Sequence, residues 1–228
     1  MSSQEMSVTI NGSRLKAREG MTILDAATEN DIEIPTLCYS SELAHPIGAC
    51  RICVVEVEGS RTLPASCHTP IGPDMVIHTH SPRVLKARRM IVELMLANHT
   101  DDCHMCDKAN VCELRKIAAD LGVAISRFDG QRRFYQIEDV SPWIVRDLSK
   151  CILCLRCVHV CNELQQGKVF SVAYRGFDTK VVSGMDAPLN EEVCRDCDAC
   201  VQICPVGALE RKEDRFKVKE STPLLIRG

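Results

Sequence analysis

Hydrophobic and polar residues alternate in four short stretches of the first third of the chain, which is the pattern of half-buried strands. These stretches are residues 7–10, 14–17, 53–58 and 75–79. The first two flank Asn11-Gly12, a pair of residues typical of tight hairpin turns. Thr22 and Asp25 have the spacing of a helix N-cap and its capping partner, and they predict a short helix that ends at Glu29. The pattern predicts a compact β-rich unit over residues 1–80.

After this unit the hydrophobic period lengthens to three or four residues, which indicates helices. Ser81-Pro82 provides an N-cap followed by proline at the first helical position. The apolar face of this helix is predicted to carry Val84, Ala87, Ile91, Leu94 and Met95. A basic face carries Arg83, Lys86 and Arg89. That basic face is either solvated or a docking face for an acidic partner.

A second amphipathic helix completes a small helical unit over residues 81–122. Its apolar residues are Val111, Leu114, Ile117, Ala118 and Leu121. Gly122 is expected to stop it. Residues 123–147 hold a local concentration of aromatic residues, namely Phe128, Phe134, Tyr135 and Trp143. We expect this stretch to be a connector that packs between the helical unit and the last unit, residues 148–228. Residues 168–174 and 179–183 predict a hairpin inserted into that last unit.

The composition places the chain in a reducing compartment. The hydrophobic fraction of 45% includes 15 cysteines, and the remainder is low for a large core. An odd number of cysteines argues against a closed disulfide framework. The N-terminus has no apolar signal region, and the longest apolar run, residues 90–97, is too short to span a membrane and contains Glu93. A net charge of −3 gives no reason to expect nucleic acid. We expect a cytoplasmic protein.

Two complete runs of one metal-binding pattern dominate the last unit. Residues 151–161 and 194–204 both have the spacing C-x2-C-x2-C-x3-C, in which the fourth cysteine reaches across to the other cluster. On that rule one [4Fe–4S] cluster takes Cys151, Cys154, Cys157 and Cys204. The other takes Cys194, Cys197, Cys200 and Cys161. Zinc is the alternative, but it normally uses two separated CxxC pairs and would leave a ligand of each triple unused.

Four further cysteines lie in or beside loops of the β-rich unit. They are Cys38, Cys50, Cys53 and Cys67, with the spacing C-x11-C-x2-C-x13-C. This spacing differs from the plant-type ferredoxin run. The order of hairpin, helix, ligand loop, strand and distant fourth cysteine nevertheless matches a β-grasp fold built around a [2Fe–2S] cluster. A zinc site with four cysteines is the alternative.

Counting ligands points to one ligand that is not cysteine. Cys103, Cys106 and Cys112 remain, and they cannot complete a cluster that needs four ligands. The nearby candidates for the missing ligand are His99, His104, Asp101, Asp102 and Asp107. The ring of His104 would have to fold back on its own loop, whereas His99 is directed into the loop by the helix that carries it. We therefore favour His99.

With these residues in place, His99-x3-Cys103-x2-Cys106-x5-Cys112 resembles the histidine-ligated [4Fe–4S] motif of the large iron–sulfur subunit of respiratory complex I. The same order of motifs is similar to the N-terminal part of iron-only hydrogenases and of some NAD-linked formate dehydrogenases. It also resembles the whole diaphorase iron–sulfur subunit of bidirectional NAD-linked nickel–iron hydrogenases. The resemblance covers about residues 7–210, and the chain length and residues 172–176 look closest to the diaphorase subunit. One departure is Asn162, where many ferredoxin runs have proline.

The resemblance implies an α+β protein that holds one [2Fe–2S] and three [4Fe–4S] clusters and has no catalytic site of its own. It would relay single electrons, within a hetero-oligomer, between a flavin- and NAD(P)-binding subunit and a catalytic subunit of a hydrogenase or a formate dehydrogenase. The chain contains neither G-x-G-x-x-G nor G-x-x-x-x-G-K-[ST], so we expect the nucleotide on another subunit. Two other classes stay open. A truncated hydrogenase would need cysteines for a catalytic metal, and a zinc-stapled binding module could use the same ligands.

Overall fold

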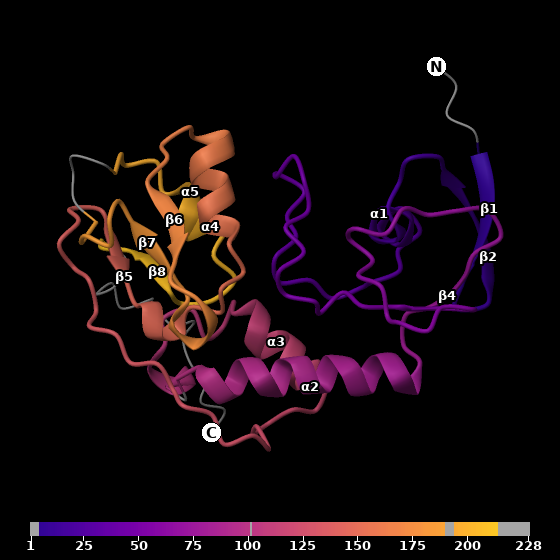
Figure 1. The fold of residues 1–228 in the computed structure, drawn as a ribbon, viewed down its shortest axis with the longest axis horizontal. Coiled ribbons are helices and arrows are strands. Elements are labelled where there is room, and N and C mark those ends of the chain that lie inside the picture. The colour runs from indigo at the N-terminus through magenta and orange to yellow at the C-terminus, as the bar shows by residue number, and fades with distance from the viewer. Residues whose placement is uncertain (1–4, 101, 190–193, 214–228) are drawn as a thin grey trace, which may run out of the picture.

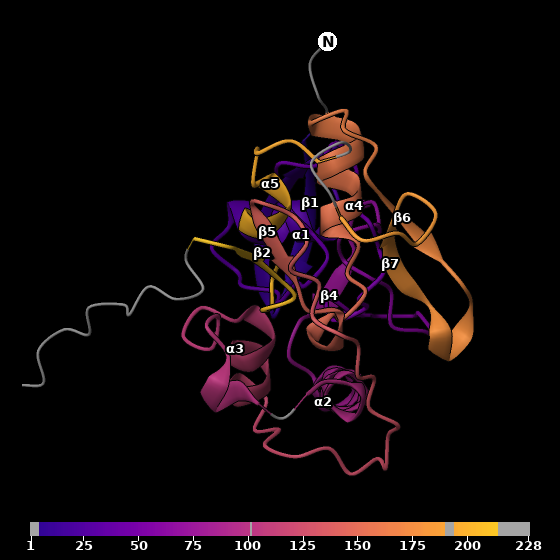
Figure 2. The same ribbon diagram turned by 90° about the vertical axis from the view of Figure 1, so that its left-hand side faces the viewer.

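The computed structural model describes residues 5–100, 102–189 and 194–213. Two sheet-containing units lie next to each other on the same side of the long helix α2 (Pro82–Asn98), and Figures 1 and 2 show this arrangement from two directions. The shorter helix α3 (Glu113–Asp120) lies beside α2. Within the described ranges, no helix combines the length and the apolar composition needed to cross a bilayer. The fold is α+β, as the sequence predicts.

The N-terminal unit is a four-stranded mixed sheet with one helix. The strands are β1 (Glu5–Ile10), β2 (Ser13–Arg18), β3 (Glu56–Val57) and β4 (Val76–His78). Their order is β2-β1-β4-β3, with β1 and β4 parallel and the other pairs antiparallel. The hairpin turn at Asn11-Gly12 has positive φ at both residues, and the capping box of Thr22 and Asp25 begins α1 (Ile23–Glu29). The predicted hairpin and helix are confirmed.

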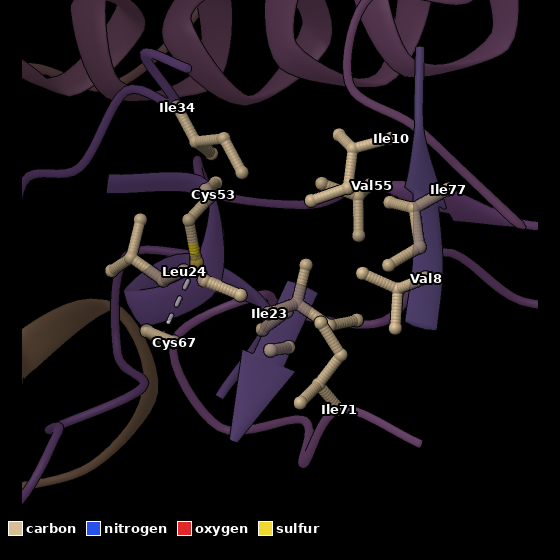
Figure 3. Packing of buried hydrophobic residues seen from close by; sticks show 14 residues of the cluster. Val8, Ile10, Ile23, Leu24, Ile34, Cys53, Val55, Cys67, Ile71 and Ile77 are labelled. Atoms are coloured by element: carbon tan, nitrogen blue, oxygen red, sulfur yellow. Dashed lines mark hydrogen bonds between the residues drawn. The ribbon is translucent and has the colours of Figure 1, made fainter. Parts of the chain in front are cut away.

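The core of this unit connects its sheet to two of the cysteines. Val8, Ile10 and Ile77 from the parallel strands pack with Ile23 of α1 and with the buried side chain of Cys53 (Figure 3). Cys67 belongs to the same buried cluster. The sheet and helix therefore fix the two segments that carry these thiols.

Residues 53–58 form less strand than their alternation predicts. Only β3 pairs with β4, whereas Cys53, Val54 and Val55 are all buried and have no exposed face. Val54 makes an isolated bridge with Ala65, and this bridge holds the loop together near Cys67. The expected strand was wrong in its first half, because the alternation of residue types there does not correspond to an alternation of burial.

Helix α2 begins at its predicted N-cap, where the Ser81 side chain accepts a hydrogen bond from the backbone N–H of Val84. Val84 of the expected apolar face is buried, and Ile91 and Met95 pack against a buried cluster. The prediction was wrong for Leu94, which is 47% exposed. Arg88 and Val92, which were not expected on this face, are buried. The basic residues Arg83, Lys86 and Arg89 are exposed, as predicted.

The C-terminal unit consists of two small antiparallel sheets and short helical segments. Strands β5 (Ile144–Arg146) and β8 (Leu209–Arg211) form one sheet, and β6 (Phe170–Ala173) and β7 (Lys180–Ser183) form the other. The second pair is the predicted hairpin, and it is confirmed. The helices are α4 (Arg156–His159), which continues as a π-helix over Val160–Leu164, and α5 (Ala199–Gln202). Short 3-10 helices occur at Cys103–Met105, Leu148–Lys150 and Gly176–Asp178.

The aromatic residues before β5 pack less than expected. Phe134 is 75% exposed and Phe128 is also exposed. Trp143 packs against the core of the C-terminal unit, and the backbone N–H of Tyr135 donates to Ser149 Oγ at 2.8 Å. The prediction that all four aromatic residues pack was therefore wrong for Phe134 and Phe128.

A second buried cluster joins all the units. It contains Leu37 from the N-terminal unit, Val92 from α2, Leu114 from α3 and Val206 from the C-terminal unit. Cys38, Cys50 and Cys154 are members of the same cluster. We call this set, with the other residues of that cluster, the shared core. It places cysteines from distant parts of the sequence close to one another.

Candidate metal centres

Four cysteines of the C-terminal unit line one cavity with an empty volume of about 450 Å³. They are Cys151, Cys154, Cys157 and Cys204. Cys151 and Cys154 lie on a loop in which Leu153 and Leu155 have positive φ, so that the backbone curls around the cavity, and Cys157 lies in the first turn of α4. Cys204 follows α5 and comes from the other cysteine run. The structure thus brings together the same four residues that the crossing pattern groups. We call this cavity centre A.

The remaining cysteines of the two runs line a larger cavity of about 1220 Å³. They are Cys161, Cys194, Cys197 and Cys200. Cys161 lies in the π-helix after α4, far in sequence from the other three. A Cβ atom on Gly167 would lie 3.1 Å from Cys161 Sγ, so glycine leaves room for this thiol. We call this cavity centre B.

Burial makes the thiols of both centres hard to ionise on their own. Burial raises the pKa of Cys151 to about 11, and the charge of Cys204 raises it further. Burial also raises the pKa of Cys194 to about 11, with Cys197 and Cys161 adding to the effect. A thiol binds metal as the thiolate, so a cation that replaces these protons relieves the repulsion among the sulfurs. The donor set of four soft sulfurs around one cavity fits an iron–sulfur cluster.

The central unit contributes a third cavity, of about 310 Å³, with one histidine and three cysteines in its lining. These residues are His99, Cys103, Cys106 and Cys112. His99 is the C-cap residue of α2, and Cys112 is the N-cap residue of α3. The end of α2 therefore fixes the position of His99, and the start of α3 fixes that of Cys112. We call this cavity centre C.

The ring of His99 is oriented as that of a metal ligand. Its Nδ1 lies 2.8 Å from the carbonyl oxygen of Thr100. Since a carbonyl only accepts hydrogen bonds, Nδ1 carries the proton and Nε2 keeps a free lone pair. Nε2 is buried, and in the described part of the chain it has no hydrogen-bond partner. Metal-binding histidines typically donate their other N–H to a carbonyl or carboxylate in this way.

The other candidates for the missing ligand are less well placed. Asp102 lines the cavity of centre C but is exposed. His104 is exposed and does not line that cavity. Asp107 lines a neighbouring cavity instead, and Asp101 lies outside the described residues.

The cysteines of the N-terminal unit are all buried and lie close together; we call them centre D. The Sγ atoms of Cys53 and Cys67 share a hydrogen bond of 3.4 Å (Figure 3). Cys38 Sγ accepts a hydrogen bond of 3.4 Å from the backbone N–H of Cys50. Hydrogen bonding between the side chains lowers the pKa of Cys53 beside Cys67 and the pKa of Cys50 beside Cys38, and it raises the pKa of Cys67 and of Cys38. In each pair one thiol is thus easier to ionise than its partner.

No three histidine, cysteine or acidic side chains of the described ranges converge tightly enough to hold a single metal ion. The thiols and His99 instead surround shared spaces, three of which are the cavities of centres A, B and C.

Centres A and C are joined by an ion pair that the sequence did not reveal. Glu113, next to Cys112, binds both terminal nitrogens of Arg156 at 2.7 and 2.9 Å. Arg156 lies between Cys154 and Cys157 and is buried. The backbone N–H of Glu113 also donates to the carbonyl oxygen of Pro205 at 3.0 Å. These contacts tie the segment after Cys112 of centre C to the segments that carry Cys154, Cys157 and Cys204 of centre A. We call this junction the wall between the two centres.

Gly207 is a second feature of this wall that pattern reasoning missed. A Cβ atom at this position would lie 2.7 Å from Cys106 Sγ, closer than real side chains approach. Only glycine therefore lets the backbone after Cys204 lie directly against a thiol of centre C. In the sequence, Gly207 stands out by following Cys204 after three residues. Rules for the spacing of metal ligands do not consider such a glycine.

Three family models match the chain in succession. A 2Fe-2S iron–sulfur cluster binding domain matches residues 3–82. The NADH-ubiquinone oxidoreductase-G iron–sulfur binding region matches residues 88–127. The ferredoxin-like domain of NADH-quinone oxidoreductase subunit 3 matches residues 141–210. These models show domains for [2Fe–2S] and for [4Fe–4S] clusters.

Relatives of known name share these domains. The NADP-reducing hydrogenase subunit HndD of Solidesulfovibrio fructosivorans is 43% identical over 220 residues, covering 95% of this chain and 38% of that protein. The G 2 subunit of the NADH-quinone oxidoreductase of Rhizobium meliloti (strain 1021) is 38% identical over 214 residues, covering 93% of this chain and 25% of that protein. The chain thus spans well under half the length of either relative.

A solved structure matches over almost the whole of both chains. A chain of the NAD+-reducing [NiFe]-hydrogenase in the H2-reduced state superposes with a TM-score of 0.86 at 28% identity. The match covers 96% of this chain and 90% of that chain. This chain is therefore built from iron–sulfur cluster binding domains, is related to the G subunits of NADH-quinone oxidoreductase and to a subunit of an NADP-reducing hydrogenase, and shares the fold of a chain of the NAD+-reducing [NiFe]-hydrogenase.

Proposed function

We propose that the chain is a four-cluster electron relay. Centre D would hold a [2Fe–2S] cluster through Cys38, Cys50, Cys53 and Cys67. Centre C would hold a [4Fe–4S] cluster through His99, Cys103, Cys106 and Cys112. Centres A and B would each hold a [4Fe–4S] cluster through the four cysteines that line them. The observation that carries this proposal is the gathering of all sixteen residues into four sets of four, each from the expected segments.

Contacts between residues of neighbouring centres support a single path through the chain. Cys38 and Cys50 of centre D lie in the shared core with Cys154 of centre A. Centre C adjoins centre A across the wall formed by Gly207 and the Glu113–Arg156 pair. The thiol of Cys157 in centre A is affected by the charge of Cys200 in centre B. This arrangement supports electron movement through the chain in single steps.

Iron–sulfur clusters supply one-electron transfer, whereas a pyridine nucleotide delivers two electrons together. A flavin on a partner subunit must therefore divide the pair. The chain's own residues exclude water from the buried thiols and hold the His99 proton on Nδ1. The second partner would be the catalytic subunit of an NAD(P)-linked hydrogenase, which the names of two relatives support. A formate dehydrogenase is the alternative for this second partner.

We infer a hetero-oligomer in a reducing compartment, the cytoplasm. All fifteen cysteines are free in the structure. Disulfides form readily in oxidising compartments, and a chain with fifteen unpaired thiols keeps its metal ligands only where thiols stay reduced.

Metal content tests the cluster assignment directly. One [2Fe–2S] and three [4Fe–4S] clusters require about 14 iron ions and as many sulfide ions per chain. We expect anaerobically purified, brown protein with this content by iron and acid-labile sulfide analysis. A colourless protein that contains zinc and no labile sulfide would instead support the zinc-stapled module.

The relay role makes a second prediction. The full chain with its clusters should be reduced by dithionite but should oxidise no NADH or NADPH with an artificial dye as acceptor, because it lacks a nucleotide-binding motif. Dye reduction in the absence of any flavoprotein would reveal a nucleotide site on this chain. It would contradict the proposal that the nucleotide binds to a partner subunit.

A further inference from the structure

Arg88 is the most deeply buried cation of α2. Its side chain is only 1% exposed, and its Nη2 donates a hydrogen bond of 2.8 Å to the carbonyl oxygen of Val54. Val54 directly follows Cys53, a cysteine of centre D. The guanidinium group thus reaches from the helix into the loop that carries the thiols.

Arg88 differs from the other buried arginines of the described residues in having no carboxylate partner. Arg146 pairs with Glu138 at 3.1 Å, and Arg156 pairs with Glu113. Within the described residues the Nε of Arg88 has no hydrogen-bond partner, and a negative charge on Cys53 raises the pKa of the guanidinium group. A buried charge is expensive unless an opposite charge compensates it. The fold therefore places this cation on the loop of centre D, next to Cys53 and without a carboxylate bound to it in the described part of the chain.

Arg88 stays charged in this environment. Burial lowers its pKa to about 10, and the nearby Cys53 opposes this effect. The group is therefore protonated at neutral pH.

We propose that Arg88 is a positioning residue that compensates the negative charge of the [2Fe–2S] cluster in centre D and raises its midpoint potential. This inference rests on the proposed cluster assignment. A two-iron cluster with four thiolate ligands is anionic, and reduction adds one more negative charge. A fixed cation close to the thiolates stabilises the reduced form more than the oxidised form, because Coulomb attraction grows with the charge. The effect is strong because the site is buried and screened little by salt.

The same helix connects this charge to centre C. His99 lies eleven residues after Arg88, and at the α-helical rise this is about 16 Å along α2. One rigid element therefore fixes both the cation of centre D and the histidine of centre C. The charge of Arg88 should act on the near centre and leave the others unchanged.

The experiment compares four full-length proteins with their clusters: native, Arg88→Met, Arg88→Lys and Lys86→Met. Methionine keeps an unbranched stem and removes the charge, whereas lysine keeps the charge. Lys86→Met is the matched control, since it removes one charge from the exposed side of the same helix. The midpoint potential of the [2Fe–2S] centre is measured by redox titration monitored by electron paramagnetic resonance.

We expect the equilibrium constant for reduction of this centre to fall at least tenfold in Arg88→Met, a shift of about 59 mV to lower potential. The midpoint potential of this centre in Arg88→Lys should stay closer to the native value, and the potential in Lys86→Met should equal the native value. An unshifted potential in Arg88→Met overturns the inference, and so does a shift in Arg88→Lys as large as in Arg88→Met.

Loss of the cluster gives an equally clear result. If Arg88→Met loses the [2Fe–2S] signal and Arg88→Lys keeps it, the positive charge is what the site requires. If both variants lose it, the hydrogen bond to Val54 is a structural contact and the inference fails. Absence of a [2Fe–2S] signal from the native protein would instead refute the proposed function.

Discussion

Cys204→Ala is expected to destroy the cluster of centre A and spare that of centre B, although Cys204 belongs to the second cysteine run. Its side chain lines the cavity of Cys151, Cys154 and Cys157. The reciprocal variant, Cys161→Ala, should destroy the cluster of centre B, because Cys161 lines the cavity of the second run. Each variant should lose about four of about 14 irons per chain.

Iron content alone does not show whether the cluster of centre A or that of centre B has been lost. The cysteine thiols that become free when a cluster is lost do show it. Alkylation of the anaerobic protein followed by mass spectrometry should label Cys151, Cys154 and Cys157 in Cys204→Ala. In Cys161→Ala the label should appear on Cys194, Cys197 and Cys200. The two variants serve as controls for each other. If Cys204→Ala instead exposes the thiols of its own run, each run holds its cluster alone and the crossed grouping is refuted.

His99→Ala is expected to lose the cluster of centre C or leave one of its irons open to solvent. Nε2 of His99 is buried without a partner in the described residues, and the Thr100 carbonyl fixes the ring in the tautomer that can bind metal. His99→Cys should keep a four-iron cluster, because it restores a fourth ligand. A thiolate adds a negative charge that the neutral imidazole lacks, so the midpoint potential of this cluster should fall. Histidine ligation raises the potential of Rieske centres in the same direction.

Redox titration followed by electron paramagnetic resonance measures both outcomes. His104→Ala is the matched control, since that histidine is exposed and does not line the cavity of centre C. Its signals and potentials should equal those of the native protein. Unchanged signals in His99→Ala would exclude His99 as a ligand, and a change in His104→Ala alone would point to His104.

The groups of cysteines could be found from the sequence because spacing is a local property. Three cysteines two residues apart must line one loop, and the crossing of the fourth follows from the repeat. The placement of His99 followed from the helix that ends beside it. The predicted hairpins and the N-cap at Ser81 also depend on neighbouring residues only.

The residues that surround the centres could not be found in this way. Arg88 occupies a position with apolar periodicity, and only the packing of α2 on the loop at Val54 shows where its charge lies. Gly207 and the Glu113–Arg156 pair act between segments that are far apart in the sequence. The exposure of Phe134 likewise depends on which surfaces the rest of the chain covers. Spacing in the sequence indicates candidate ligands, whereas tertiary packing decides the environment of each candidate.

The shared core has a consequence for the order in which the protein is made. Leu37, Cys38 and Cys50 pack with Val206 and Ala208, which leave the ribosome more than a hundred residues later. The sheet of the N-terminal unit can form early, but its ligand loop lacks one side of its packing until synthesis of the chain is almost complete. Until then, the side of Cys38 and Cys50 that the shared core buries in the folded chain has no covering residues from the C-terminal unit.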